Sequence, residues 1–349
     1  MYINKNLPKW LYKPYYILYN MKCVKSSLKH AEEVKKEILS LGILSHKYKI
    51  VKDKYYVYFP ITKRISGFEI VEKKLPKKIV RLSFEEVLRK KFTKEEFTIL
   101  SKSYDIIGNI AVLEINDEFL KNKRIIAEAL IQSNKNIKTV VRKVGEHKGQ
   151  YRVQDYELLA GEKNFETLHK ENSIFLKLNI SKVYYSPRSA NERLRIAISV
   201  KAGENVLVMF SGIGVYPFVI AKYSKANEIY GVEINPDACS YADYNLELNK
   251  LRNVKLLCGD VNKIVPSLNK KFDRIIMPLP SGSMNFLDLA LKFLNRNGII
   301  HLYYFSSEEN VDSVVEGIKK KCKCKILNII KAGQQSPKIY RYCIDFIVS

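Results

Sequence analysis

The spacing of apolar residues predicts a small unit at the start of the chain. Over 28–41 apolar residues recur at helical spacing, and Gly42 follows where a residue just after a helix is expected. The stretch 48–61 then predicts two short strands around a Lys-Asp-Lys turn. We therefore expect an α/β unit over 1–62, followed by a charged, weakly periodic linker over 63–78.

A second unit is predicted over 79–180. Ser83 is a candidate cap for a helix that carries Phe84 inward. The stretch 104–115 predicts a buried strand with a bend at Gly108. An amphipathic helix with a basic face and two strands follow, at 120–134, 137–145 and 150–161.

From residue 181 to residue 349 the pattern changes to alternating strands and helices. Six strands are predicted, at 205–210, 228–234, 254–260, 272–279, 298–305 and 342–348. Helices are predicted between them, near 217–224, 236–249, 284–294 and 308–321. The alternation indicates an α/β fold, a Rossmann-like doubly wound, mostly parallel sheet, preceded here by two smaller α+β domains. Ligands of such sheets bind at the carboxyl ends of the strands.

Three successive strand ends of this sheet carry candidate binding residues. Gly212 and Gly214 form a tight turn in "VLVMFSGIGVYPF", and glycines there let a ligand approach the backbone. Glu233 ends the second strand, where an acid accepts both ribose hydroxyls, and Asp260 ends the third, where it can receive an adenine amino group. Each acid taken singly is equally well explained as a turn residue or a helix cap. The trio, without a third glycine or a Walker lysine, fits S-adenosylmethionine better than a nicotinamide cofactor.

The charge of the chain favours a polyanionic partner. Of its 349 residues, 60 are Lys or Arg and 36 are Asp or Glu, a formal net charge of +24. A lysine-rich proteome is the alternative explanation. The six cysteines lack zinc spacing, so no metal is expected, whereas a disulfide at Cys322 and Cys324 remains open. Without a signal peptide or an apolar run of transmembrane length, the sequence predicts a cytoplasmic protein that does not contact a membrane.

The stretch "SPRSANERLR" (186–195) has two interpretations. Ser189 and Glu192 have the S-x-x-E spacing of a capping box, a common helix start. The arginines around them would then be surface charges. Alternatively, Glu192 accepts a proton from a bound substrate.

The whole pattern resembles the archaeal and eukaryal tRNA (guanine-37-N1)-methyltransferases. The motifs that carry the resemblance are "VYYSPRSANERLRIA", "MFSGIG", "GVEINP", "GDV" and "DRIIMPLP". The likeness extends to 103–115, to 151–162 and to "YVYFP" (56–60), and so covers nearly the whole chain. It implies a monomeric enzyme that uses S-adenosylmethionine to form N1-methylguanosine at position 37 of tRNA. The N-terminal module would touch the tRNA body, and the other two domains would hold the anticodon loop.

Residue by residue, the resemblance assigns Glu192 as the general base and Arg152 as the group near guanine O6. Methylation of N1 requires its proton to leave, and a nearby carboxylate can accept it. Negative charge then develops on O6, where a fixed guanidinium stabilises it. The implied cofactor-binding residues are Phe210, Gly212, Gly214, Glu233, Asp260 and Pro278. The implied tRNA-binding residues are Tyr184, Arg188 and Arg193, the arginines contacting phosphates or orienting Glu192.

Three departures from the family pattern leave other functions open. The family's Asn-Leu-Pro is Pro278-Leu279-Pro280 here, an acid of the first sheet strand is replaced by Val208, and Tyr216 is available to line the pocket. Loss of the asparagine is compatible with C7-methylation of the wyosine precursor imG2, instead of or beside N1-methylation. Aminocarboxypropyl transfer, as in wybutosine synthesis, is a weaker alternative, because Arg188 and the Leu-Pro step are present. A non-catalytic tRNA-binding module is a further one.

Overall fold

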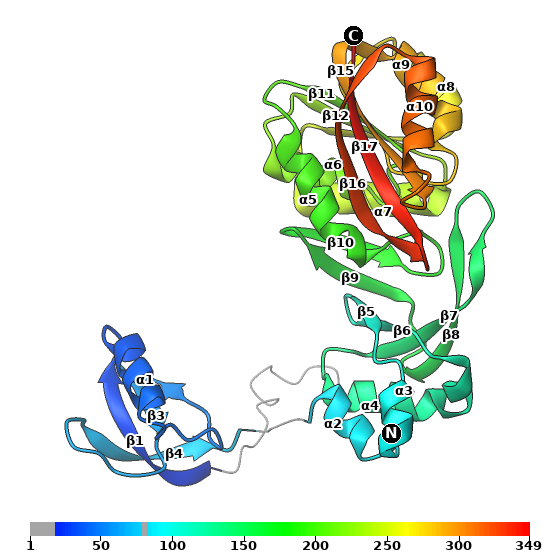
Figure 1. Cartoon of the computed structure of the whole chain (residues 1–349). Helices are drawn as coiled ribbons and strands as arrows, with labels where there is room; N and C mark the ends of the chain where they lie inside the picture. Colours follow the sequence, from blue (N-terminus) through cyan, green and yellow to red (C-terminus); the bar gives the residue numbers. More distant parts are fainter. Residues whose placement is uncertain (1–17, 79–81) are drawn as a thin grey trace, which may run out of the picture. The chain divides into compact units, whose positions relative to one another are not determined.

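The computed structural model describes residues 18–78 and 82–349 (Figure 1). The chain divides into two compact units, Met1–Leu82 and Ser83–Ser349. Residues 1–17 of the predicted N-terminal module and 79–81 of the predicted middle domain lie outside the described residues.

The described part of the first unit contains one helix and four strands. They are β1 (Leu18–Ser27), α1 (Ala31–Ser40), β2 (Val51–Lys52), β3 (Tyr56–Pro60) and β4 (Ile70–Pro76). The strands form an antiparallel sheet in the order β2-β3-β1-β4, and Val24, Ile38 and Phe59 lie in the core between sheet and helix. The predicted helix and two strands are confirmed. Gly42, with a φ of 63°, lies just after the helix as expected.

The predicted linker over 63–78 is wrong, because it contains β4. This strand pairs with β1 from Leu18↔Pro76 to Val24↔Ile70. β4 is an edge strand whose residues are mostly half-exposed, apart from the buried Leu75. Charged residues are common in such strands, and here they interrupt the apolar alternation that would have predicted a strand. β1 was not predicted either.

The second unit begins with a small α+β part. Its elements are α2 (Phe84–Arg89), α3 (Lys94–Ile99), β5 (Tyr104–Ile107), β6 (Ile110–Leu113), η2 (Asp117–Asn122), α4 (Lys123–Ser133), β7 (Thr139–Lys148) and β8 (Val153–Gly161). Ser83 caps α2 as predicted and forms a capping box with Glu86. The single strand predicted over 104–115 is instead the antiparallel pair β5 and β6. Gly108 lies in the turn between them with a φ of +58°, and a Cβ there would lie 2.0 Å from the Thr167 hydroxyl.

An unpredicted hairpin connects this part to the large sheet. It consists of β9 (Glu166–Glu171) and β10 (Ile174–Asn179), and it packs on α7 (Pro236–Asn249). The Asn245 side chain of α7 accepts a hydrogen bond from the Lys177 amide (2.7 Å) and donates one to its carbonyl (3.0 Å). The hairpin therefore belongs with the sheet domain, and the boundary predicted after residue 180 is wrong by the length of this hairpin.

The large sheet has the order β13-β12-β11-β14-β15-β17-β16. Its strands are β11 (Asn205–Met209), β12 (Glu228–Glu233), β13 (Val254–Cys258), β14 (Phe272–Met277), β15 (Leu294–Ser306), β16 (Cys324–Ser336) and β17 (Ile339–Val348). The first five in this order are parallel, and β17 runs antiparallel between β15 and β16. All six predicted strands are confirmed, whereas β16 was missed in its lysine-rich segment.

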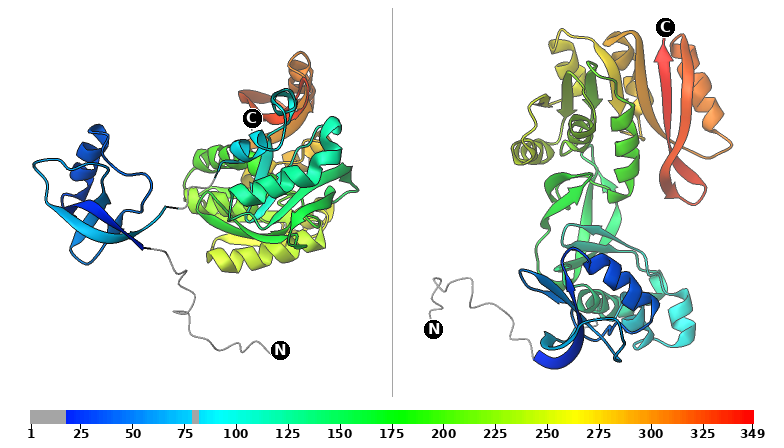
Figure 2. Two further views of the ribbon diagram at one scale, coloured as in Figure 1. Left: turned by 90° about the horizontal axis from the view of Figure 1, so that it is seen from below. Right: turned by 90° about the vertical axis from the view of Figure 1, so that its left-hand side faces the viewer.

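Helices cover both faces of this sheet, which confirms the doubly wound α/β prediction (Figure 2). They are η3 (Pro187–Ser189), α5 (Ala190–Ser199), α6 (Val215–Tyr223), α7, α8 (Val261–Ser267), η4 (Ser283–Phe286), α9 (Leu287–Lys292) and α10 (Val311–Lys321). Along β11, Val206 and Val208 face the core shared with α5, α6 and α7, whereas Leu207 and Met209 face α8, α9 and α10. Of the described helices, none is long and apolar enough to cross a membrane.

Candidate functional site

A cavity of about 510 Å³ lies where β11, β12, β13 and β14 end. This is the place at which open α/β sheets bind ligands, and the volume suits a small organic cofactor. The cavity brings together five of the six predicted cofactor-binding residues, Phe210, Gly212, Glu233, Asp260 and Pro278. The aromatic rings of Phe210 and Phe286, 4.9 Å apart between centroids, form an apolar wall.

Glu233 is fixed at the end of β12 by two backbone groups. One carboxylate oxygen accepts a hydrogen bond from the Gly212 amide and the other from the Asn235 amide, each at 2.8 Å. Gly212, at a φ of +58°, makes this turn possible. The carboxylate is therefore oriented before any ligand binds and still has lone pairs for ribose hydroxyls.

Asp260 is both a helix cap and a cavity residue, so the two interpretations of this acid are compatible. Its side chain accepts a hydrogen bond from the Asn262 amide at the start of α8, and it lines the cavity. Two residues before it, Cys258 forms a disulfide with Cys239 of α7. Cys322 and Cys324 are free.

Gly214 has a different role from the one predicted. It is not among the residues that line the described cavities, and it precedes α6 with a φ of +86°. A Cβ at this position would lie 2.4 Å from the Phe218 ring. Gly214 thus allows the close packing of the turn on α6.

A second cavity, of about 710 Å³, adjoins the first. It lies between β5 to β8 and the segment 183–188, and it also reaches the β16–β17 hairpin. Four residues line both cavities, namely Arg152, Tyr184, Ser281 and Phe305. A ligand in one cavity can therefore meet a ligand in the other at these residues.

Arg152 lies in the β7–β8 turn with a φ of +53°. Its guanidinium carbon lies 5.7 Å from the centroid of the half-exposed Tyr184 ring, in a cation–π arrangement. The His147 ring packs on the same tyrosine, and Nδ1 of His147 is 2.9 Å from the Arg152 carbonyl. Burial lowers the pKa of His147. Arg152, predicted to be catalytic, and Tyr184, predicted to bind tRNA, thus both lie at the junction of the cavities.

Arg188 also lines the second cavity, but it is already paired. Its Nε donates to Asp105 at 2.9 Å and its Nη2 donates to Glu114. These bonds connect the segment before α5 to β5 and β6. A phosphate at this arginine has to compete with two carboxylates.

Arg193 differs from its prediction, because it is buried. Its guanidinium donates to Glu171 of β9, with Nε at 2.7 Å, and to the Ser186 carbonyl at 2.9 Å. In this arrangement it holds the segment before α5 against the β9–β10 hairpin and does not offer a surface for a phosphate.

Glu192 is buried outside both of these cavities. Its carboxylate accepts two hydrogen bonds from Arg195, at 2.7 and 2.8 Å, and one from the Tyr303 hydroxyl at 2.6 Å. It is 7% exposed and is not among the residues lining the described cavities. The capping-box interpretation is wrong, because the Ser189 side chain makes no capping bond at the start of α5.

Tyr216, expected near the pocket, is buried in the same network. Its hydroxyl donates to that of Tyr303 at 3.0 Å. Tyr303 and Phe305 are two residues apart on one face of β15, so the tyrosine that donates to Glu192 is next on that face to a residue lining both cavities.

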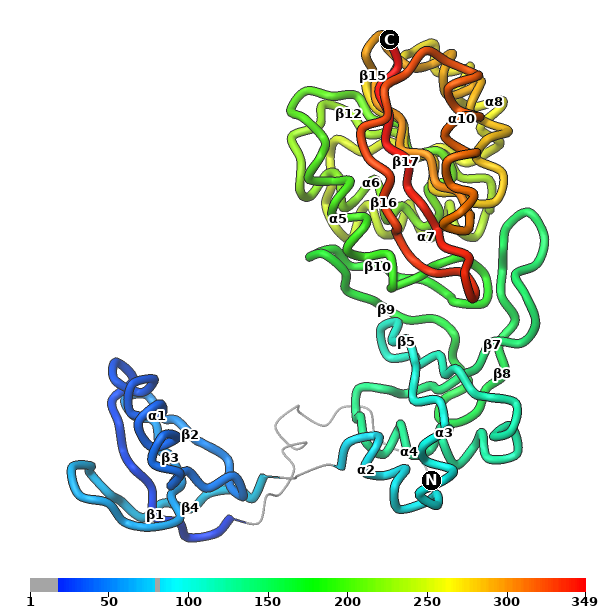
Figure 3. Tube along the Cα trace, in the orientation of Figure 1, coloured from blue at the N-terminus to red at the C-terminus, as the bar shows by residue number. Residues whose placement is uncertain are grey.

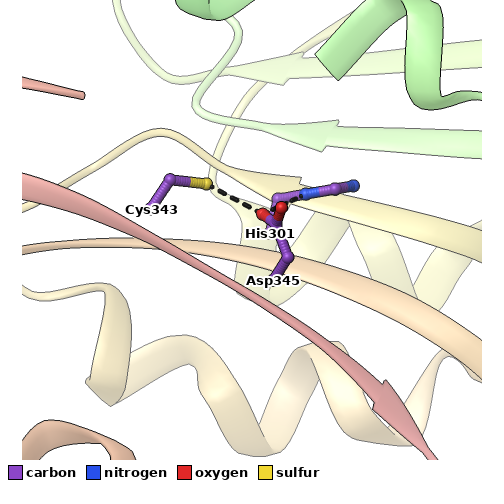
Figure 4. A group of neighbouring side chains, drawn as sticks. All are labelled: His301, Cys343 and Asp345. Carbon is purple, nitrogen blue, oxygen red and sulfur yellow. Dashed lines mark hydrogen bonds and ion pairs between the residues drawn. The ribbon is translucent and has the colours of Figure 1, made fainter. Parts of the chain in front are cut away.

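A buried polar ladder continues from Glu192 along β15 and β17, where His301 pairs with Asp345 and Tyr303 with Cys343. Figure 4 shows that His301, Cys343 and Asp345 converge, within 4.8 Å of one another. His301 Nδ1 is 2.6 Å from Asp345, and its Nε2 is 2.6 Å from Arg274 Nη1, which can only donate. His301 is therefore neutral with its proton on Nδ1, and burial lowers its pKa.

This ladder is a closed hydrogen-bonded network rather than a metal site. Asp345 also accepts two bonds from Arg195, and Arg274 is held by Glu204 of the segment before β11. Arg195 thus pairs with Asp345, and Arg274 with His301. Sequence reasoning missed these residues because the antiparallel pairing of β15 with β17 brings them together across a long separation.

Family models match three segments of the chain. They are the TRM5/TYW2 methyltransferase domain over 167–330, the TYW2 N-terminal domain over 84–164 and the tRNA methyltransferase 5 N-terminal domain over 23–69. The first match begins at β9, in agreement with the domain boundary of the structure.

Relatives match almost the entire length of the chain. The tRNA (guanine(37)-N(1))-methyltransferase Trm5b of Pyrococcus abyssi is 36% identical over 333 residues, which is 93% of this chain and 98% of that protein. The solved complex of aTrm5 and tRNALeu has a TM-score of 0.71 and 33% identity, and the match covers 94% of this chain and 99% of the other. The TYW2 structure of Methanocaldococcus jannaschii in complex with AdoMet has a TM-score of 0.54 and 26% identity, over 71% of this chain and 100% of that one.

Proposed function

The chain belongs to the TRM5/TYW2 family of tRNA methyltransferases, and we propose that it transfers a methyl group from S-adenosylmethionine to N1 of guanosine 37 in tRNA. The observation that carries this proposal is the junction of the two cavities. The first has the residues for an adenosine-containing cofactor, and the second shares Arg152, Tyr184, Ser281 and Phe305 with it. A methyl donor and a base can therefore meet there.

The residues of the first cavity fit S-adenosylmethionine. The Glu233 carboxylate, oriented by two backbone amides, is an acceptor for ribose hydroxyls, and Asp260 is an acceptor for the adenine amino group. When bound, the cofactor supplies an electrophilic methyl group. Phe210, Phe286 and Pro278 provide an apolar enclosure that keeps water away from it.

We assign Arg152 and Tyr184 to the target base. The Tyr184 ring is half-exposed at the junction and offers a face on which a base turned out of the anticodon loop can stack. The guanidinium carbon of Arg152 lies 5.7 Å from the centroid of the same ring, so a base that reaches this ring comes close to it. There it can stabilise the negative charge that develops on O6 when N1 loses its proton.

We assign the removal of that proton to Glu192, with a condition set by its hydrogen bonds. The carboxylate now accepts from Arg195 and Tyr303, so it must exchange at least one of these donors for the N1 proton. Its position in the first turn of α5, directly after the segment that lines the second cavity, supports such an exchange when tRNA binds. The net charge of +24 favours that binding, and one chain supplies all the residues named, so we propose that the enzyme acts as a monomer.

The proposal is tested with S-adenosylmethionine and two tRNAs, one with unmodified guanosine at position 37 and one with the imG2 precursor. Nucleoside mass spectrometry reads the products. N1-methylguanosine from the first tRNA is the expected result. An aminocarboxypropyl adduct, or no product from either tRNA, would contradict methyl transfer.

C7-methylation of imG2 is a second candidate, alone or in addition, and Pro278 favours it. This residue lines the first cavity where the family pattern has asparagine, and proline has no side-chain amide to hold guanine. Product from the imG2 tRNA alone would make Pro278 part of a changed specificity.

A further inference from the structure

Arg341 lies one strand away from the junction of the cavities. It is the third residue of β17 and pairs directly with Phe305 of β15, which lines both cavities. Side chains of directly opposed residues lie on the same face of a sheet, about 5 Å apart at Cβ. Arg341 therefore extends toward the second cavity and forms part of its lining.

The neighbouring strand is shaped to make room for this guanidinium. The register between β16 and β17 shifts between Lys331 and Gly333, and a Cβ on Gly333 would lie 3.1 Å from Arg341 Nη2. At its φ of +152°, Gly333 has a conformation that other residues rarely adopt. Figure 3 shows β16 and β17 side by side at this hairpin. The displaced strand presents the Ala332 carbonyl, which accepts a hydrogen bond from Nη2 at 2.6 Å.

The rest of the guanidinium is free of acidic partners. Within the described part of the chain, Arg341 Nε is buried and has no hydrogen-bond partner. Nearly all buried N–H groups in proteins have an acceptor, and one without a partner carries an uncompensated desolvation cost, so this N–H calls for an explanation. By contrast, Arg188 on the same cavity is neutralised by Asp105 and Glu114. Among the described residues, Arg341 thus lines the second cavity with a positive charge that no carboxylate neutralises and with one N–H that lacks an acceptor.

We propose that Arg341 binds a backbone phosphate of the nucleotide that enters the second cavity, and so positions its base at the junction. This inference rests on the proposed function, which places a tRNA nucleotide there. A guanidinium offers only donors in a fork that matches phosphate oxygens, and such charge-assisted bonds are stronger than neutral ones. The amides of Gln334 and Gln335, which also line this part of the cavity, can add neutral contacts.

The test combines protein variants with single neutral linkages in the tRNA. Arg341→Ala, Arg341→Lys and the wild type are compared on tRNA with natural phosphates and on tRNA with one methylphosphonate on the 5′ or the 3′ side of position 37. The control is Arg296→Ala, which removes an exposed positive charge near the start of β15, away from the cavities. Single-turnover rates, tRNA dissociation constants and thermal unfolding are measured for each.

On natural tRNA we expect Arg341→Ala to lower kcat/KM by on the order of tenfold to a hundredfold, and Arg341→Lys by less. On tRNA with the methylphosphonate at the contacted linkage, the same variant should cause little further loss. Arg296→Ala should behave as the wild type on every substrate. The contrary result is an equal loss of kcat/KM for Arg341→Ala on all substrates, together with an Arg341→Lys variant that is folded and equally impaired. Arg341 would then contact the base edge or have only a structural role, and the inference would be wrong.

The outcome is separable from that of the proposed function. Formation of N1-methylguanosine by the wild type tests the function without any Arg341 variant. If the wild type forms no methylated product, the dissociation constants still show whether the variant and the neutral linkage act on the same contact. If the Arg341 variant and the neutral linkage weaken tRNA binding independently of each other, the phosphate contact is rejected.

Discussion

Two groups of charged residues in the sheet domain differ in what holds them. At the first cavity, the Glu233 carboxylate accepts hydrogen bonds from backbone amides and faces an open volume. In the buried ladder, Glu192 and Asp345 are bridged by Arg195. A ligand can use the first group without breaking any bond, whereas use of Glu192 requires a partner to be displaced.

The difference separates two ways of preparing a carboxylate for chemistry. Backbone amides orient Glu233 and leave its remaining lone pairs available. The ladder instead stores Glu192 in a paired state, and removing one partner of a buried ion pair typically destabilises a protein by about 3–5 kcal/mol. The binding of tRNA would have to supply a comparable free energy to expose Glu192, so the availability of this carboxylate depends on the substrate.

The largest effect is expected for Glu192→Gln, which retains the shape of the side chain but cannot accept the proton. The single-turnover rate of N1-methylation should fall by on the order of a thousandfold, whereas S-adenosylmethionine affinity stays unchanged. Rapid-quench kinetics and calorimetric titration measure the two quantities. An unchanged rate would assign Glu192 to the ladder alone.

Arg152→Ala tests the junction itself. Loss of the guanidinium should lower the rate of methyl transfer by about a hundredfold, because charge on O6 is no longer stabilised, while tRNA affinity falls much less. The rate at saturating tRNA and the dissociation constant are compared in the same preparation. A larger loss in affinity than in rate would make Arg152 a phosphate contact.

Glu233→Gln tests the carboxylate of the first cavity, which a ligand can use without displacing a hydrogen-bond partner. Without the charged acceptor for the ribose hydroxyls, the dissociation constant for S-adenosylmethionine should rise by on the order of tenfold to a hundredfold. The control is Glu247→Gln at an exposed position of α7, which should leave this dissociation constant unchanged. Equal constants for both variants would remove Glu233 from the cofactor site.

The smallest effect concerns the ladder, where His301 is neutral and faces Arg274, Asp345 and Cys343. Burial lowers the pKa of His301 below its ordinary value of about 6.5, so its stabilising contribution is complete above that pH and is lost as the pH falls. Between pH 6.5 and 5 the free energy of unfolding should decrease by about 1–2 kcal/mol.

His301→Gln should flatten this dependence, because the titrating group is gone. Burial alone would raise the pKa of Asp345, but bonds from His301 and Arg195 hold it below its usual range, so Asp345 stays ionised over this interval. Denaturant unfolding at several pH values compares the two proteins. Parallel slopes for wild type and variant would place the titration elsewhere.

Local motifs predicted the first cavity well and the ladder not at all. Gly212, Glu233 and Asp260 each lie at the end of a strand or within three residues of it, and the parallel order of the strands brings these ends together. The surroundings of Tyr303 and Arg341 depend on β17, which lies antiparallel between β15 and β16. No short sequence motif predicts this pairing. The same reason explains the mistaken linker, since β4 is recognised only by its partner β1.

The disulfide between Cys239 and Cys258 ties α7 to the end of β13, one of the strand ends that form the first cavity. The bond closes a loop with a sequence separation of 19. In the chain-entropy model such a cross-link stabilises the native state by about 3 kcal/mol, through the freedom it removes from the unfolded chain. Resistance of the enzyme to heat thus depends on the thiol reagent in the buffer, even where its turnover does not.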